Sequence, residues 1–165
     1  MSTTIDVQPQ SEFELVIGRI LDAPRGAVWR CWTEAALLQQ WFCPRPWSVP
    51  EADFDLKPGG RFNTVFAGPD GERITNESVW LDIEPQQRLV FTDFFSEGFI
   101  PKAEGFMTGF VHMDDAPDGK TRFIWGARHR TAEAMQQHLD MGMREGWSIC
   151  ADQLEAVAKS VSAET

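Results

Sequence analysis

The sequence predicts an α+β fold in which one long C-terminal helix lies across an antiparallel sheet. Two observations lead to this prediction. After residue 131, apolar residues recur three and four positions apart, as on one face of a helix. Upstream, turn signals at regular spacing separate segments that alternate apolar and polar residues, as in β-hairpins. These signals are Pro58-Gly59-Gly60, Gly68-Pro69-Asp70-Gly71, Glu84-Pro85-Gln86-Gln87 and Ala116-Pro117-Asp118-Gly119.

The first part of the chain predicts one strand and two short helices. Residues 1–12 are polar, and we expect them to form a flexible lead-in. The run FELVIGRIL at 13–21 is rich in β-forming residues and favours the first strand. Pro24 fits the first turn of a helix, which should end near Thr33. A second short helix is expected over 34–41, before a proline-rich stretch that cannot continue it.

Further strands are expected between the turn signals, and they bring the sheet to seven strands. They lie at residues 52–56, 61–67, 73–83, 88–95, 106–113 and 121–130. The connection at 96–105 is longer than the others and carries two apolar residues, Phe99 and Ile100. Because long loops are often functional, we expect this one to be a lid over a cavity or the contact of a homodimer.

The last element is predicted as a single helix of about 30 residues, much longer than average. Thr131 is expected to cap its start, and the helix should run to about Val161. Its apolar stripe must cover an apolar surface, and the concave side of the sheet is the candidate. The stripe consists of Met143, Trp147, Cys150, Leu154, Val157 and Val161. Residues 13–161 should therefore form one domain, with 162–165 as a tail.

The composition limits the classes of function. The 165 residues include 25 acidic and 15 basic side chains, and the net charge of −10 disfavours binding to nucleic acid. No apolar stretch approaches the ~18 residues of a membrane-spanning helix, and the polar start does not match a signal peptide. We therefore expect a cytoplasmic protein with reduced cysteines and no membrane insertion. Seven Trp and twelve Phe without any Tyr predict an unusually apolar interior.

Seven short motifs follow one another along the chain. They are Asp22-Ala-Pro-Arg-Gly-Ala-Val-Trp29, Trp32-Thr-Glu34, Gln40-Trp41-Phe42, Asp55-Leu-Lys-Pro-Gly-Gly-Arg-Phe62, Gly68-Pro-Asp-Gly71, Arg88-Leu-Val-Phe-Thr-Asp93 and Glu145-Gly-Trp147. This ordered set resembles the activator-of-heat-shock-protein-ATPase homologue family of the START-like (SRPBCC, helix-grip) superfamily. The resemblance implies a curved seven-stranded sheet around a long C-terminal helix, with a deep apolar cavity between them. It implies the fold more strongly than the function, since the superfamily includes lipid carriers, hormone receptors, polyketide cyclases and co-chaperone domains.

Apolar side chains on the strands and on the helix stripe predict the wall of this cavity. The expected apolar lining is Trp32, Trp41, Phe54, Phe66, Phe91, Trp125, Met143, Gly146 and Trp147. Three polar contacts are expected beside it: Glu77 and Asp93, whose strand neighbours of like phase are apolar, and His129 at the end of the last strand. His138 is expected to be solvated. No metal-ligand spacing or cofactor motif occurs, so neither a metal nor a cofactor is expected.

Three functions remain open at this stage. The favoured one is the binding of a small apolar or amphipathic ligand in the cavity, with no catalytic residue assigned. The second is an enzyme of the cyclase or hydrolase type, in which an Asp or Glu would act with His129 on a ligand in the same cavity. The third is a chaperone-interaction module, in which exposed surfaces and the Phe99 loop matter and the cavity does not.

Overall fold

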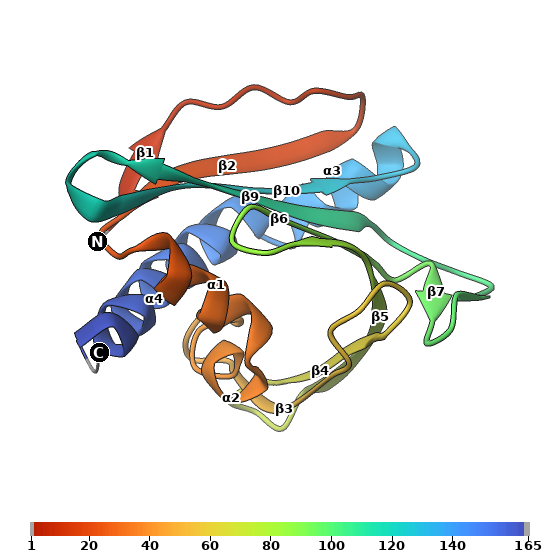
Figure 1. Cartoon of the computed structure of the whole chain (residues 1–165). Coiled ribbons are helices and arrows are strands. Elements are labelled where there is room, and N and C mark those ends of the chain that lie inside the picture. The colour runs from red at the N-terminus through yellow and green to blue at the C-terminus, as the bar shows by residue number, and fades with distance from the viewer. Residues whose placement is uncertain (1, 164–165) are drawn as a thin grey trace.

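Ten strands and four α-helices make up residues 2–163 of this computed structural model (Figure 1). The strands are β1 (Thr3–Ile5), β2 (Glu14–Leu21), β3 (Ser48–Phe54), β4 (Arg61–Ala67), β5 (Arg73–Glu84), β6 (Arg88–Thr92), β7 (Phe95–Ser96), β8 (Ile100–Pro101), β9 (Thr108–Ala116) and β10 (Lys120–Arg128). The helices are α1 (Arg25–Thr33), α2 (Ala35–Leu38), α3 (Ala132–Asp140) and α4 (Met143–Ala163). A 3₁₀ turn, η1 (Pro117–Gly119), joins β9 to β10.

Eight of the strands form one antiparallel sheet in the order β1-β2-β10-β9-β6-β5-β4-β3. The sheet curves around α4, and α1 packs against that helix (Figure 1). The predicted α+β layout is confirmed, including the two short helices that follow the first long strand. The strand count differs from the seven predicted, because β1 adds an eighth strand to the sheet. Strands β7 and β8 form a separate small hairpin in the connection expected to be a loop.

Strand β1 lies within residues 1–12, which were expected to be a flexible lead-in. It pairs antiparallel with β2 at the edge of the sheet. Gly18 leaves the space for this segment, since a Cβ there would lie 2.5 Å from Val7 Cγ2 and 2.7 Å from Ile5 Cγ1. The hydroxyl and backbone N–H of Ser2 also donate to a carboxylate of α4. The polar composition of the segment gave no sign that it would pair with the edge of β2.

Most strand boundaries agree with the prediction to within a few residues. Strand β4 begins and ends where expected. Strand β3 begins earlier, at Ser48, although Pro50 lies inside it. Proline is tolerated there because β3 is the edge strand, where an N–H can point away from the sheet.

The predicted single C-terminal helix is wrong, because the structure divides it into α3 and α4. Thr131 caps α3 as expected, its hydroxyl accepting a hydrogen bond of 3.1 Å from Ala134 N. The break comes at Gly142, whose φ of +82° is left-handed, and its N–H donates to Leu139 O at 2.9 Å. The apolar stripe of α4 does face the core, and Leu154 in its middle is fully buried. None of the helices within residues 2–163 is long and apolar enough to cross a membrane.

The two glycines near this break should respond to alanine with opposite signs. Gly142→Ala should lower the free energy of unfolding by about 1 kcal/mol, because the left-handed conformation is strained for alanine. Gly146→Ala should raise it by up to about 1 kcal/mol, because Gly146 is helical and a Cβ there would meet only Pro44 Cγ at 3.7 Å. Urea unfolding of both variants measures the difference. Equal signs would contradict this assignment of the break.

The core between the sheet and α4 is filled by interlocking aromatic rings. Phe62 stacks on Trp80 with ring centroids 4.2 Å apart. Trp32 and Trp41 make an edge contact at 4.8 Å, and the indole N–H of Trp41 donates to Cys31 O at 3.0 Å. Much of the aromatic excess in the composition therefore serves packing, and only part of it is left to line a pocket.

Candidate functional site

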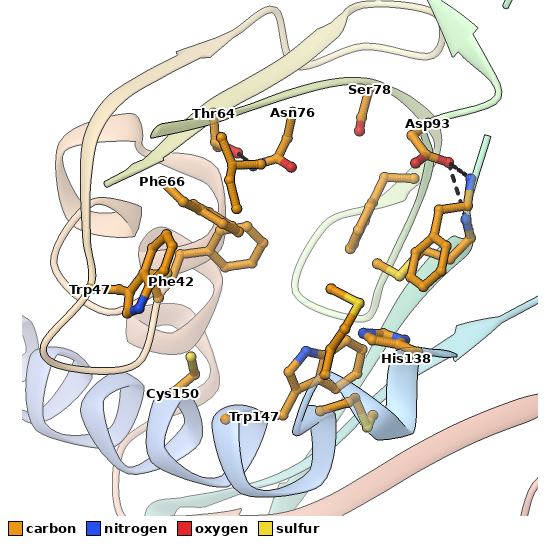
Figure 2. A pocket seen from close by; sticks show the side chains of 18 of the residues that line it. Phe42, Trp47, Thr64, Phe66, Asn76, Ser78, Asp93, His138, Trp147 and Cys150 are labelled. Atoms are coloured by element: carbon orange, nitrogen blue, oxygen red, sulfur yellow. Dashed lines mark hydrogen bonds between the residues drawn. The ribbon is translucent and has the colours of Figure 1, made fainter. Parts of the chain in front are cut away.

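A pocket of about 530 Å³ lies between the β4–β5 part of the sheet, α4 and the segment before β3 (Figure 2). Its apolar wall includes Phe42, Trp47, Phe62, Phe66, Phe91, Phe106, Met107, Trp125, Met143 and Trp147. Its polar wall includes Thr64, Asn76, Ser78, Asp93, Lys102 and His138. Figure 2 shows Phe42, Trp47 and Phe66 on one side of the pocket, with Asp93 and His138 on the other. The pocket is thus amphipathic.

The pairing register of β4 and β5 places aromatic and polar side chains on the same face. Phe62 pairs with Ser78, Thr64 with Asn76, and Phe66 with Ile74. Cross-strand partners share a face of the sheet, so these side chains all point toward the pocket. Asn76 Nδ2 donates to Thr64 Oγ1 at 3.2 Å, and this bond fixes the amide of Asn76.

Six of the nine predicted apolar lining residues border this pocket: Phe66, Phe91, Trp125, Met143, Gly146 and Trp147. The other three, Trp32, Trp41 and Phe54, lie outside it, contrary to the prediction. Trp32 and Trp41 are at most 1% exposed, because they pack against each other and against the ring of Trp125 in the core. Phe54 packs against Phe62 and Trp80 in the neighbouring part of the core. Alternation and helical spacing mark a side chain as inward, but they do not distinguish a filled interior from a pocket wall.

Glu77 was expected to point inward, and this expectation is wrong. It pairs with Asn63 on the face opposite to Phe62, and its side chain is 51% exposed at the pocket rim. The misplacement comes from a β-bulge between Trp80 and Asp82, which shifts the phase of β5. Residues beyond the bulge alternate out of step with those before it. Lys102 Nζ bonds the Glu77 carbonyl at 3.0 Å.

Asp93 lies at the pocket, directly after β6. Its Oδ1 accepts hydrogen bonds from the backbone N–H of Phe106, at 2.8 Å, and of Met107, at 3.1 Å (Figure 2). Among residues 2–163, no hydrogen bond reaches Oδ2. Asp93 therefore holds the start of the β9 segment against the pocket and has one carboxylate oxygen left for a further contact.

His129 and His138 form a buried pair at the α3 side of the pocket. His129 Nε2 lies 2.9 Å from His138 Nδ1, and His129 Nδ1 lies 2.8 Å from Phe13 O. Both residues are 7% exposed, so His138 is not solvated as expected. Burial and, to a smaller extent, the nearby His129 lower the pKa of His138 to about 4. Of the two, only His138 lines the pocket; His129 stands behind it.

The acid–base pair that the enzyme hypothesis requires is not assembled. His129 bonds His138 and the Phe13 carbonyl, and no hydrogen bond within residues 2–163 joins it to Asp93 or Glu77. The pocket-lining thiols are also unsuited to nucleophilic attack. Burial raises the pKa of the Cys43 thiol to about 11 and holds the pKa of Cys150 well above its usual range. Residues 2–163 contain no group of three or more metal-ligating side chains.

The exposed hairpin β7–β8 is not a lid. Phe99 and Ile100, 44% and 61% exposed, do not line the pocket. The hairpin bonds instead to the turn between β3 and β4, where Gly98 N donates to Gly59 O at 2.8 Å. A Cβ on Gly59 would lie 2.7 Å from the Phe99 ring, so this glycine admits the hairpin. The homodimer contact stays a prediction.

Several pocket residues were not predicted from the sequence. Asn76 and Ser78 could have been found from the pairing of β4 with β5, since they alternate in phase with Phe62 and Phe66. For the segment of Phe42, Pro44 and Trp47, the sequence predicted only that its prolines end a helix, and Phe42 belonged to one of the family motifs. The structure shows that it forms one wall of the pocket.

Comparisons with known proteins agree with this fold. The family model "Activator of Hsp90 ATPase homolog 1-like protein" matches residues 22–159. Among solved structures, protein NE0264 from Nitrosomonas europaea is 34% identical, with a TM-score of 0.89 over 94% of this chain and 99% of that chain. Protein Ms6760 from Mycobacterium smegmatis is 29% identical, with a TM-score of 0.77 over 93% and 96%. A protein from Arthrobacter aurescens is 25% identical, with a TM-score of 0.80 over 96% and 93%. The search of curated proteins gives no match.

Proposed function

We propose that this chain, which belongs to the Activator of Hsp90 ATPase homolog 1-like family, binds a small apolar or amphipathic molecule in the pocket between the sheet and α4. The observation that supports this most is the pocket itself. Its volume of about 530 Å³ falls within the ~300–1,000 Å³ typical of small-molecule sites. Its wall joins aromatic rings to a few polar side chains, which is the usual composition of such sites.

Gly146 leaves space in the α4 wall of the pocket, between the larger side chains of Met143 and Trp147. Gly146 faces the pocket without a Cβ, and the position that a Cβ would take meets only Pro44 Cγ at 3.7 Å. Met141 and Ile74 stand at the border, 69% and 47% exposed. Exposed apolar residues around a concave site support the entry of an apolar molecule.

Filling the pocket should weaken binding without unfolding the domain. We expect Gly146→Leu to weaken the binding of 2-naphthol by at least about tenfold, because the leucine side chain would occupy the ligand's space. Gly146→Ala is the matched control and should bind like the wild type. Quenching of tryptophan fluorescence measures the dissociation constants, since Trp47, Trp125 and Trp147 line the pocket. Equal affinity of the leucine variant, with its circular dichroism unchanged, would place the binding elsewhere.

A further inference from the structure

A chain of three groups connects the backbone of residue 13 to the pocket. The Phe13 carbonyl lies 2.8 Å from His129 Nδ1, and His129 Nε2 lies 2.9 Å from His138 Nδ1. The remaining ring nitrogen, His138 Nε2, has no hydrogen-bond partner among residues 2–163, and its residue lines the pocket (Figure 2). His138 Nε2, at the end of this hydrogen-bonded series, is therefore available to a molecule in the pocket.

When both rings are neutral, the Phe13 carbonyl determines where their protons lie. A carbonyl oxygen only accepts hydrogen bonds, so His129 Nδ1 must carry a proton and donate it. In the neutral ring, His129 Nε2 then has a lone pair and accepts from His138 Nδ1–H. Neutral His138 therefore has its proton on Nδ1 and a lone pair on Nε2. Its free nitrogen is a hydrogen-bond acceptor.

The surroundings of His138 keep its ring neutral and fixed. The ring contacts Phe106 and Trp147, with centroids 5.1 Å and 5.6 Å away. Burial among these rings lowers the pKa of His138 to about 4, so the imidazole carries no charge at neutral pH. The neutral ring of His138, in contact with two aromatic side chains, therefore offers a single acceptor, Nε2, in a fixed orientation.

Other polar atoms of the pocket wall are also acceptors. Asp93 Oδ2 has no partner among residues 2–163, while its Oδ1 holds two backbone N–H groups. One N–H of the Asn76 amide donates to Thr64 Oγ1, which leaves the carbonyl oxygen and the second N–H of Asn76 available. The ammonium of Lys102 bonds the Glu77 carbonyl at the rim. These acceptors match a molecule that donates hydrogen bonds, and the wall also holds one buried donor without a partner among residues 2–163, the indole N–H of Trp125.

We propose that His138 Nε2 accepts a hydrogen bond from the ligand, so that the pocket selects a molecule with a hydroxyl or N–H donor on an apolar body. This inference rests on the proposed function, because it names the class of ligand for the same pocket. His138 is the contact residue. His129 acts through it, as a positioning residue that fixes its tautomer.

Two probes with the same apolar body test the donor requirement. The hydroxyl of 2-naphthol donates a hydrogen bond, whereas 2-methoxynaphthalene cannot. At pH 8 the wild type should bind 2-naphthol about tenfold more tightly, the ratio expected for one hydrogen bond. In His138→Phe, which keeps an aromatic ring, the ratio of the two dissociation constants should fall to about one.

The outcomes separate this inference from the proposed function. Equal binding of both probes by the wild type overturns the role of His138 and leaves the pocket a binding site. The same conclusion follows if the ratio of the two dissociation constants is unchanged in His138→Phe but lost in Asp93→Asn. Binding of neither probe overturns the proposed function as well. Long-range ¹H–¹⁵N NMR of the wild type gives a test that needs no variant. The proton of His138 should lie on Nδ1, and a proton on Nε2 would overturn the inference.

Discussion

Replacement of Gln153 by leucine is expected to lower the free energy of unfolding by about 3 kcal/mol, the cost of about three lost hydrogen bonds to buried groups. Gln153 is 7% exposed on the inner face of α4. Its Nε2 donates to Trp41 O and Cys43 O, both at 2.9 Å, and its Oε1 accepts from Arg45 N at 3.2 Å. One side chain thus satisfies three backbone groups of the segment before β3. Leucine would leave all three unpaired.

Urea unfolding measures this effect against a glutamine that has no such role. Gln136 lies on the exposed face of α3, and among residues 2–163 its side chain bonds only Asp140. Gln136→Leu should change the free energy of unfolding by no more than about 0.5 kcal/mol. Similar losses in the two variants would show that Gln153 does not anchor the segment. The Gln153 variant should also bind 2-naphthol more weakly, because this segment carries Phe42, Pro44 and Trp47 to the pocket.

Trp125→Ala is expected to have the largest effect, a loss of about 4 kcal/mol in the free energy of unfolding. The Trp125 ring is 3% exposed, stacks on Trp147 at a centroid distance of 4.0 Å and contacts Trp32 at 5.3 Å. Alanine would leave a cavity that these rigid rings cannot fill. Trp125 also lines the pocket, so it connects the stability of the core to the shape of the site.

Trp47→Ala provides the comparison for this prediction. Trp47 lines the same pocket but is only half-buried. Its removal should cost less than half as much stability, while it still weakens the binding of 2-naphthol. Thermal or urea unfolding of both variants, with fluorescence titration of the folded ones, distinguishes the two roles. A greater loss of stability in Trp47→Ala would contradict the division between core and pocket wall.

The sequence predicted the strands well because their signals are local. The turn after β4 is marked by glycine, proline and aspartate and the turn after β5 by Pro85, and alternation over 61–67 shows directly which residues share a face. The ordered motifs also led to the family, which the match over residues 22–159 confirms. Hairpins therefore need little tertiary information to be recognised.

The features that were missed depend on contacts between distant parts of the chain. The break at Gly142 turns α3 away from α4 and brings His138 against His129, which a continuous helical pattern does not show. The bulge in β5 changes which residues face inward, so the alternation read from Leu81 and Ile83 put Glu77 on the wrong face. Trp32 and Trp125 have the same inward pattern, yet only Trp125 reaches the pocket, because other aromatic rings surround Trp32.

The most direct test of the account is to map where 2-naphthol binds, by ¹H–¹⁵N NMR of the wild-type protein. The pocket predicts that the largest shifts occur at the backbone amides of Asn76, Ser78 and Gly146 and at the indole N–H of Trp147. The exposed hairpin of Phe99 and Ile100 should show none. Shifts confined to that hairpin, or no shifts at saturating 2-naphthol, would contradict the claim that the pocket between the sheet and α4 is a binding site.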